Sequence, residues 1–368
     1  MAIKLVPYGE HFHHSYECFS RRVGGSSALL PYQYYGQHDQ ISVNRHILID
    51  ADNNNPQPNV VGAITIKEQN FVVSGSVVRI AVATYPISLG HVDPKYALSG
   101  TLIFKKLLEE FPLNIMMVGN PSENTTSSMC RLLGWSLYPI PYLFRVQRIG
   151  PLVKKKFSKS KFVRPLVCDV ISRIFGPPID FIIQKRLLRR PSGISIKIVF
   201  SFEGDVNLWW SNYAKSVGFS MVRDMLTLNA IYPNSVGAFE RLVFQRDGNV
   251  IGYAVVLRPN PHDVISLMGA NVNTLIDFCV NESCLDDASS ALSNYFLDVN
   301  ADAIIVNHSH ALTLSSLENT GFQSRITNMY FAVSPGLSDL FKQNEVDLDE
   351  MIVSRADGDG PIGLGANL

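Results

Sequence analysis

The stretch 84–101 holds residue types that can take a proton and bind an anion. His91 is the one group near the end of a predicted strand whose ordinary pKa is close to neutrality, and this strand carries no carboxylate. His91 is therefore our candidate general base. Ser99, Gly100 and Thr101 follow at a predicted helix start, where backbone N–H groups and the helix dipole favour an anion.

Cysteine and histidine spacing predicts neither a metal site nor a disulfide framework. The five cysteines are an odd number and include no Cys-x-x-Cys pair, which indicates a reduced chain. Of the nine histidines, those at 11–14 and the pair His308 and His310 do not form one of the Cys/His ligand patterns of a zinc site. We expect no metal.

The composition excludes several protein classes. With 368 residues, 46% apolar and 17% charged, the chain has the length of about two domains and is too apolar for a disordered protein. No apolar run approaches the roughly 20 residues that span a bilayer, and the first residues lack the apolar region of a signal peptide. We expect a cytoplasmic protein.

Three landmarks occur twice, in the same order. Segment 59–66 resembles segment 249–256, and each follows turn-forming residues as in a hairpin. A buried strand is predicted at 115–120 and again at 303–308. A short helix ends in Gly134-Trp135, and another ends in Gly321-Phe322, where glycine supplies the left-handed cap. The order predicts two copies of one unit of about 140 residues.

An amphipathic helix is predicted before each buried strand, over 99–110 and over about 286–299. Each copy then reads as several strands followed by helix, strand, helix and strand. This order predicts an α/β (α+β) fold with a mixed, mainly antiparallel sheet flanked by helices in each copy.

The segment 151–191 is strongly basic. It holds eleven Lys and Arg residues against two Asp residues, whereas the whole chain has 32 of each sign. Apolar clusters alternate with the basic ones, a pattern typical of a stretch that lies on an anionic membrane surface. A linker that packs its apolar face across the domains and a phosphate-bearing partner are the alternatives. Nucleic acid is the least favoured partner, because aromatic residues are thinly interleaved with the arginines.

Residues 91–102 resemble a motif of the GNAT superfamily of acyl-CoA-dependent N-acyltransferases. In that motif Val-x-Pro-x-Tyr ends the fourth strand, and Arg/Gln-x-x-Gly-x-Gly/Ala begins the next helix. Ala97 and Leu102 depart from the second part of the motif. The matching residues are Val92, Pro94, Tyr96 and Gly100.

The resemblance implies that the pyrophosphate of coenzyme A binds the N–H groups of Ser99, Gly100 and Thr101, and that the backbone N–H of Val92 stabilises the oxyanion. The position of the family's general acid, four residues before Gly134, is Cys130. Tyr138 and Tyr142 follow on the next predicted strand and could also reach the site. The resemblance makes Asn120 and Asn124 the candidates for contacting the pantetheine arm.

The second copy resembles the family more faintly. Acidic residues at 281–287 stand where the pyrophosphate would lie, so we expect this copy not to bind coenzyme A. Asp277, His308 and His310 occupy predicted strand ends. We expect these three residues to belong to an acceptor site formed between the copies.

These observations predict four segments: a GNAT-like domain with the coenzyme A loop over 1–148, a basic amphipathic connector over 149–199, a second, degenerate GNAT-like domain over 200–335, and a C-terminal tail over 336–368. The end of the chain resembles the Asp-rich tails of acyltransferase-like proteins from bacterial polysaccharide gene clusters.

The leading hypothesis is an N-acyltransferase that uses acetyl-CoA or another acyl-CoA. Its expected acceptor is a nucleotide- or lipid-linked amino sugar, a precursor of a bacterial surface polysaccharide, with peripheral contact to the inner membrane through 151–191. Two alternatives stay open. One is tRNA-dependent aminoacyl transfer to a peptidoglycan precursor, and the other is a non-catalytic binding module with the GNAT fold.

Overall fold

A long hairpin forms the centre of the first sheet. Strands β3 (Asn59–Val73) and β4 (Ser76–Ser88) pair antiparallel, and the turn residues Ser74 and Gly75 have φ values of 44° and 78°. Positive φ at both central residues is what a two-residue type I′ turn requires. Strand β2 (Ile41–Asp50) pairs with β3 and forms the hairpin predicted before segment 59–66. Strand β1 (Ile3–Pro7) pairs with the other edge of β2.

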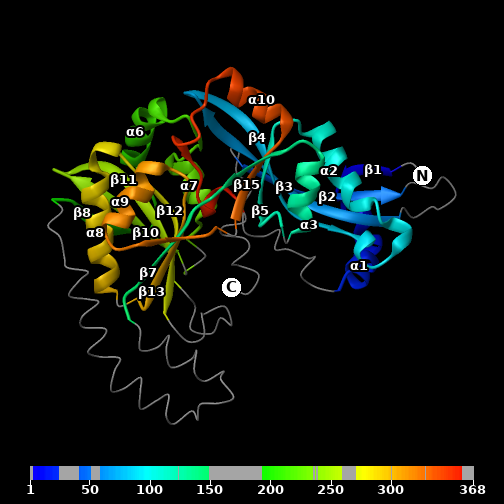
Figure 1. The fold of residues 1–368 in the computed structure, drawn as a ribbon, viewed down its shortest axis with the longest axis horizontal. Coiled ribbons are helices and arrows are strands. Elements are labelled where there is room, and N and C mark those ends of the chain that lie inside the picture. The colour runs from blue at the N-terminus through cyan, green and yellow to red at the C-terminus, as the bar shows by residue number, and fades with distance from the viewer. Residues whose placement is uncertain are drawn as a thin grey trace, which may run out of the picture. The chain divides into compact units, whose positions relative to one another are not determined.

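The structure is a computed structural model that describes residues 3–24, 41–50, 59–122, 124–148, 193–234, 237, 239–258, 271–299, 301–327 and 329–358 (Figure 1). The predicted amphipathic helices of 151–191 lie outside these residues. In the described part of the chain, no helix is both long and apolar enough to cross a membrane.

The hairpin leads into the elements that carry the family motif. Helix α2 spans Ser99–Glu110, as the periodicity predicts, and strand β5 (Asn114–Gly119) follows it. Helix α3 (Thr125–Leu132) ends before Gly134, whose φ of 80° supplies the predicted left-handed cap. Strand β6 (Ser136–Pro139) then returns to the sheet.

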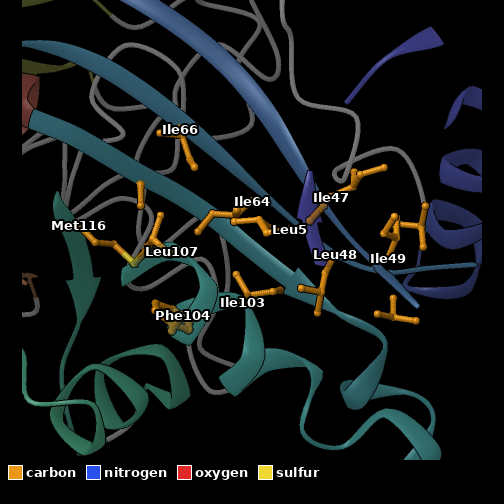
Figure 2. Close-up of a cluster of buried hydrophobic side chains, with 14 of the residues drawn as sticks. Leu5, Ile47, Leu48, Ile49, Ile64, Ile66, Ile103, Phe104, Leu107 and Met116 are labelled. Carbon is orange, nitrogen blue, oxygen red and sulfur yellow. The ribbon is translucent and has the colours of Figure 1, made fainter. Parts of the chain in front are cut away.

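The core of the first unit packs the apolar face of α2 against the sheet. Ile103, Phe104 and Leu107 are at most 2% exposed, and Figure 2 shows Ile103 and Leu107 lying near Ile64 of β3. Helix α1 (His13–Arg22) adds aromatic side chains to the same cluster. Burial of this apolar surface is the main force that holds α2 in place beside the motif loop.

The second unit repeats this order of elements. Strands β10, β11 and β12 pair antiparallel in turn, β12 pairs parallel with β13, and helices α8 and α9 lie side by side in Figure 1. The bounds are β8 (Ser195–Val199), α6 (Gly204–Tyr213), β10 (Phe239–Arg246), β11 (Asn249–Leu257), β12 (Val272–Val280), α8 (Leu285–Asp298), β13 (Ala303–Asn307), α9 (Ala311–Asn319) and β14 (Gln323–Arg325).

Two strands are exchanged between the halves of the sequence. Strand β7 (Tyr142–Val146) pairs with β13 and β14 in the seven-stranded sheet, which has the order β14-β7-β13-β12-β11-β10-β8. Strand β15 (Met329–Val333) pairs with β5 and β6 in the nine-stranded sheet, which has the order β1-β2-β3-β4-β5-β15-β6 with β9 and β16 attached. Each sheet is therefore completed by a strand from the other half.

The compact units consequently differ from the continuous ranges 1–148 and 200–335 expected from the sequence. The first unit comprises 1–140, 214–233 and 327–366, and the second comprises 141–213, 234–326 and 367–368. Hydrogen bonds between strands that are distant in sequence set these boundaries. The pattern of residues along a single strand or helix does not predict which strands will pair.

The segment expected as a C-terminal tail over 336–368 is, in its described part, built into the first unit. Helix α10 (Pro335–Gln343) follows β15, and β16 (Met351–Ile352) pairs with β9 (Phe219–Met221). The chain then turns at 354–357. Arg223, just after β9, donates from Nη2 to Asp357 Oδ2 at 3.1 Å, and both side chains are fully buried.

Candidate functional site

The cleft of the first unit opens where two parallel strands separate. Strand β4 pairs with β5 through Ala81–Val82 and Asn114–Ile115, and β4 then runs on to Ser88. Near this end the β3–β4 register shifts, and Tyr85 has a φ of 52°. A bulge of this kind bends the strand and increases its local twist. The backbone thus makes room between the carboxyl ends of β4 and β5.

The loop after β4 is a pair of 3₁₀ turns, at Leu89–His91 and Pro94–Tyr96. Its backbone folds tightly, because a Cβ on Gly90 would lie 2.5 Å from the carbonyl oxygen of Tyr96. Ser99 donates to that same carbonyl at 2.7 Å, and its hydroxyl accepts from the Gly90 N–H at 3.2 Å. Ser99 therefore holds the loop against the start of α2.

The loop is also tied to helix α1. Arg22 Nη2 lies 2.7 Å from Asp93 Oδ2, and Asp93 Oδ1 accepts from the Lys95 backbone N–H at 3.0 Å. The ion pair is partly exposed, so its role is orientation of the loop more than stability.

The expected oxyanion donor is engaged elsewhere. The strand predicted to continue through Val92 ends at Ser88, and the Val92 N–H donates to the Leu89 carbonyl at 2.9 Å. This bond closes the first 3₁₀ turn. The Val92 side chain is 50% exposed, and it contributes to the site through that side chain.

A cavity of about 290 Å³ lies beside this loop. Its polar lining is Ser88, His91, Gly100, Thr125 and Thr126, and its apolar lining is Val23, Pro86, Ile87, Val92, Ile103, Phe104 and Met129. Three of the residues expected from the sequence are thus together: the candidate base His91, Val92, and Gly100 at the start of α2. The first N–H groups of an α-helix have no carbonyl partner within it, so the start of α2 at Gly100 presents donors beside the cavity.

Helix α3 supplies residues that sequence reasoning missed. Thr125, Thr126 and Met129 line the cavity. Met129 follows Thr125 by four residues and Thr126 by three, so the three side chains share one helical face. Because the helix ending at Gly134 was predicted, this spacing could have identified the face that lines the cavity. Gly100 meets this face closely, because a Cβ on Gly100 would lie 2.9 Å from Met129 Cε.

Asn120 and Asn124 bond to their own loop. Asn124 caps α3 by accepting from the Ser127 N–H at 3.1 Å, and Asn120 accepts from the Ser122 N–H at 3.1 Å. Thr101 is half-buried in the first turn of α2. These three residues border the loops that form the site without lining the cavity.

Cys130 and Tyr138 also lie outside the cavity lining. The Cys130 side chain is fully buried, and burial raises the pKa of its thiol to about 12. Tyr138 lies half-buried on β6, opposite Phe331 of β15. Neither residue reaches the space beside His91 in this structure.

In the second unit the three expected acceptor residues are internal. Asp277 is 1% exposed and accepts a hydrogen bond from the Tyr253 hydroxyl. His308 Nε2 lies 3.1 Å from the Phe278 carbonyl, and His310 Nδ1 lies 2.8 Å from the Thr313 hydroxyl. Each side chain is buried against its neighbours in this unit. The acceptor site expected between the copies stays a prediction.

His308 joins two strands of the second unit. Strands β12 and β13 pair through Val272–Leu275 and Ala303–Val306, and β12 then continues to Val280 while paired with β11. His308 follows the end of β13 and bonds to Phe278, on the part of β12 beyond its pairing with β13. In the order of elements, these two strands correspond to β4 and β5.

Comparison with known proteins supports the fold. No protein family profile matches the sequence, and no curated protein matches it. Solved structures with a similar fold include three from bacteria. They are a GCN5-related N-acetyltransferase of Anabaena variabilis ATCC 29413 (TM-score 0.53, 10% identity, 90% of this chain and 72% of that one), a conserved Enterococcus faecalis V583 protein described as a probable N-acyltransferase (0.55, 8%, 92% and 74%), and a GCN5-related N-acetyltransferase of Kribbella flavida (0.50, 10%, 89% and 70%).

The chain has the GNAT fold. The predicted fold class is confirmed, since both sheets are mixed, mainly antiparallel and flanked by helices. The likeness to these N-acetyltransferases covers nine-tenths of the chain, so it includes the elements of both units. At 8–10% identity it establishes the fold, and the chemistry of the site has to be argued from the residues present.

Proposed function

We propose that this chain is an acyl-CoA-dependent N-acyltransferase whose donor site is the cavity of the first unit. The observation that carries the proposal is the convergence of three features at that cavity. These are the separated strands β4 and β5, the start of α2 at Gly100, and the histidine His91. The GNAT fold supports the same reading.

The residues at the start of α2 fit a phosphate-bearing donor. Gly100 has no side chain where a Cβ would crowd Met129 Cε at 2.9 Å and Ser88 Oγ at 3.4 Å. The glycine thus leaves room for these two side chains. The first-turn N–H groups of α2 lie beside the cavity, where the helix dipole favours negative charge.

Acyl-CoA, when bound, supplies a thioester carbonyl that is activated toward amines. His91 lies at the cavity and is exposed, so an acceptor amine can reach it. His91 takes the proton that the amine loses as its nitrogen forms the new bond to the acyl carbon. The carbon–sulfur bond breaks, and His91 returns the proton to the departing thiolate. The buried Cys130 is not needed in this scheme.

The acceptor remains part of the proposal. We propose an amino sugar linked to a nucleotide or a lipid, a precursor of a bacterial surface polysaccharide, supported by the likeness of the chain's end to tails in such gene clusters. The same proposal holds that the two units arose by duplication and that 151–191 contacts an anionic membrane. A panel of amino-sugar nucleotides, assayed for N-acylation, tests the acceptor.

The donor proposal is tested by calorimetry with acetyl-CoA and by kinetics of His91→Asn. We expect acetyl-CoA to bind the wild-type protein, and His91→Asn to lower kcat by about 10²–10⁴-fold with little change in donor affinity. His14→Asn, a change of an exposed histidine on α1, is the matched control. Absence of binding of free CoA, acetyl-CoA and longer acyl-CoA at millimolar concentration would overturn the proposal.

A non-catalytic binding module is the second candidate, and one observation favours it. Cys130, at the position of the family's general acid, is fully buried. A protein that binds acetyl-CoA tightly, yet transfers no acyl group to any amine in the panel, would have this second function.

A further inference from the structure

The cavity beside His91 has an extended apolar wall. Seven of its lining residues are apolar, and most of these belong to α2, α3 and the end of β4. We infer that this wall binds the aliphatic chain of a donor longer than acetyl, and that Met129 sets the length of chain accepted. The inference rests on the proposed acyl-CoA function and names its donor class.

The charge of the lining side chains determines which part of acyl-CoA can occupy the cavity. Among the described residues that line the cavity, His91 is the one ionisable side chain, so a pyrophosphate finds no lysine or arginine inside. The volume of about 290 Å³ is at the lower limit for a small-molecule pocket. The cavity therefore suits an uncharged arm and an acyl chain, with the nucleotide outside.

Two residues form a fixed rear wall. Ile103 is 1% exposed, and its Cδ1 lies 2.7 Å from where a Cβ on Gly62 would be, so it is seated on the backbone of β3. Phe104 is 2% exposed and meets Trp135 edge to face, with ring centroids 6.3 Å apart. Close packing on both sides leaves neither side chain room to move.

Met129 forms the adjustable wall. It reaches from α3 to the first turn of α2, where its Cε lies 2.9 Å and its sulfur 3.7 Å from the position of a Gly100 Cβ. The side chain is half-buried, in contrast to Ile103 and Phe104. Methionine has three rotatable side-chain bonds and fits irregular gaps. Rotation of Met129 away from Gly100 would lengthen the cavity, and a larger rigid side chain there would shorten it.

The chain-length dependence of donor affinity tests this inference. Each methylene buried in an apolar site tightens binding by about fourfold. For the wild-type protein we expect Kd to fall by about that factor per methylene from acetyl- toward longer saturated acyl-CoA, and then to level off when the cavity is filled. Calorimetry with even-numbered donors from acetyl- to decanoyl-CoA, and with free CoA, gives this curve.

Variants of Met129 move the point at which affinity levels off. We expect Met129→Ala to move it to longer chains and Met129→Phe to move it to shorter chains, when the affinity of each variant for acyl-CoA is expressed relative to its own affinity for free CoA. Met117→Ala is the matched control, because Met117 is a half-buried methionine on β5 outside the cavity lining. The opposite directions of the two variants guard against a general loss of folding.

The experiments distinguish an error in the chain-length inference from an error in the proposed acyl-CoA function. If free CoA binds but affinity is indifferent to chain length, or the Met129 variants leave the curve unchanged, the chain-length inference is overturned and the donor site stands. If neither CoA nor any acyl-CoA binds the wild-type protein, the proposed function and this inference are both overturned.

Discussion

Burial divides the ionisable groups near the cleft into those that can react and those that cannot. His91 is exposed at the cavity, whereas Cys130 is fully buried and the pKa of its thiol is raised to about 12. Desolvation disfavours the charged thiolate, so Cys130 keeps its proton at neutral pH. His91 and Cys130 were both catalytic candidates from the sequence. In the structure, His91 is accessible to exchange a proton and Cys130 is not.

His46 makes the stability of the first unit depend on pH. Its ring is 6% exposed, and burial lowers its pKa despite a backbone hydrogen bond and the charge of Glu68, which act in the opposite direction. The unfolded chain therefore takes up a proton near pH 6.5 that folded His46 does not. Because the unfolded state binds more protons, the free energy of unfolding falls as pH falls below that value.

Urea unfolding of the wild type and of His46→Leu at several pH values measures this contribution. We expect the wild type to lose stability between about pH 7 and pH 5, and the variant to show a shallower slope over the same range. Parallel slopes for the two proteins would show that His46 does not carry the effect.

The loop between β4 and α2 works as one element. Its two ends are joined by the Ser99 hydroxyl, which accepts from the Gly90 N–H and donates to the Tyr96 carbonyl, and the Gly90 backbone lies close to that carbonyl. Gly90 was not singled out from the sequence, because its requirement comes from close approach of a second backbone segment and its φ is not in the left-handed region.

Gly90→Ala tests this element. The added Cβ would lie 2.5 Å from the Tyr96 carbonyl oxygen, so the loop has to shift. Overpacking of this kind costs about 1–3 kcal/mol, and we expect weaker acetyl-CoA binding together with a lower midpoint of urea unfolding. Gly204→Ala, where a Cβ meets nothing within 4 Å, is the control. Equal behaviour of the two variants would contradict the role of Gly90.

At the scale of the whole molecule, the exchanged strands make the two halves depend on each other. A fragment 1–148 lacks β15, which lies between β5 and β6, and it carries β7 without its partners β13 and β14. Such a fragment leaves unpaired strand edges and exposed core, both of which promote aggregation.

We expect fragment 1–148 to be insoluble or to unfold without a cooperative transition, and co-expression with fragment 149–368 to restore a folded complex. Circular dichroism during thermal unfolding, with the full-length chain as reference, measures the difference. A cooperative transition of fragment 1–148 alone would show that the exchange is dispensable for folding.

Local patterns were sufficient for most single elements. The helix at 99–110 and the glycine caps at Gly134 and Gly321 follow from apolar periodicity and from backbone conformations that glycine alone adopts readily. The same periodicity and glycine signals occur in both halves of the sequence, and they predicted the shared order of strands and helices in the two units. Their resemblance to the GNAT superfamily was therefore visible in the sequence, and the fold agrees with it.

The tertiary structure decided which strand completes each sheet and which candidate residues reach a cavity. Strand exchange, the burial of Cys130, and the bridge from His308 to Phe278 all depend on partners distant in sequence. The sequence by itself determined the local elements, because helix periodicity, turns and caps are encoded within a few residues. Pairing between strands and burial are properties of the assembled chain, so only the folded structure assigns them.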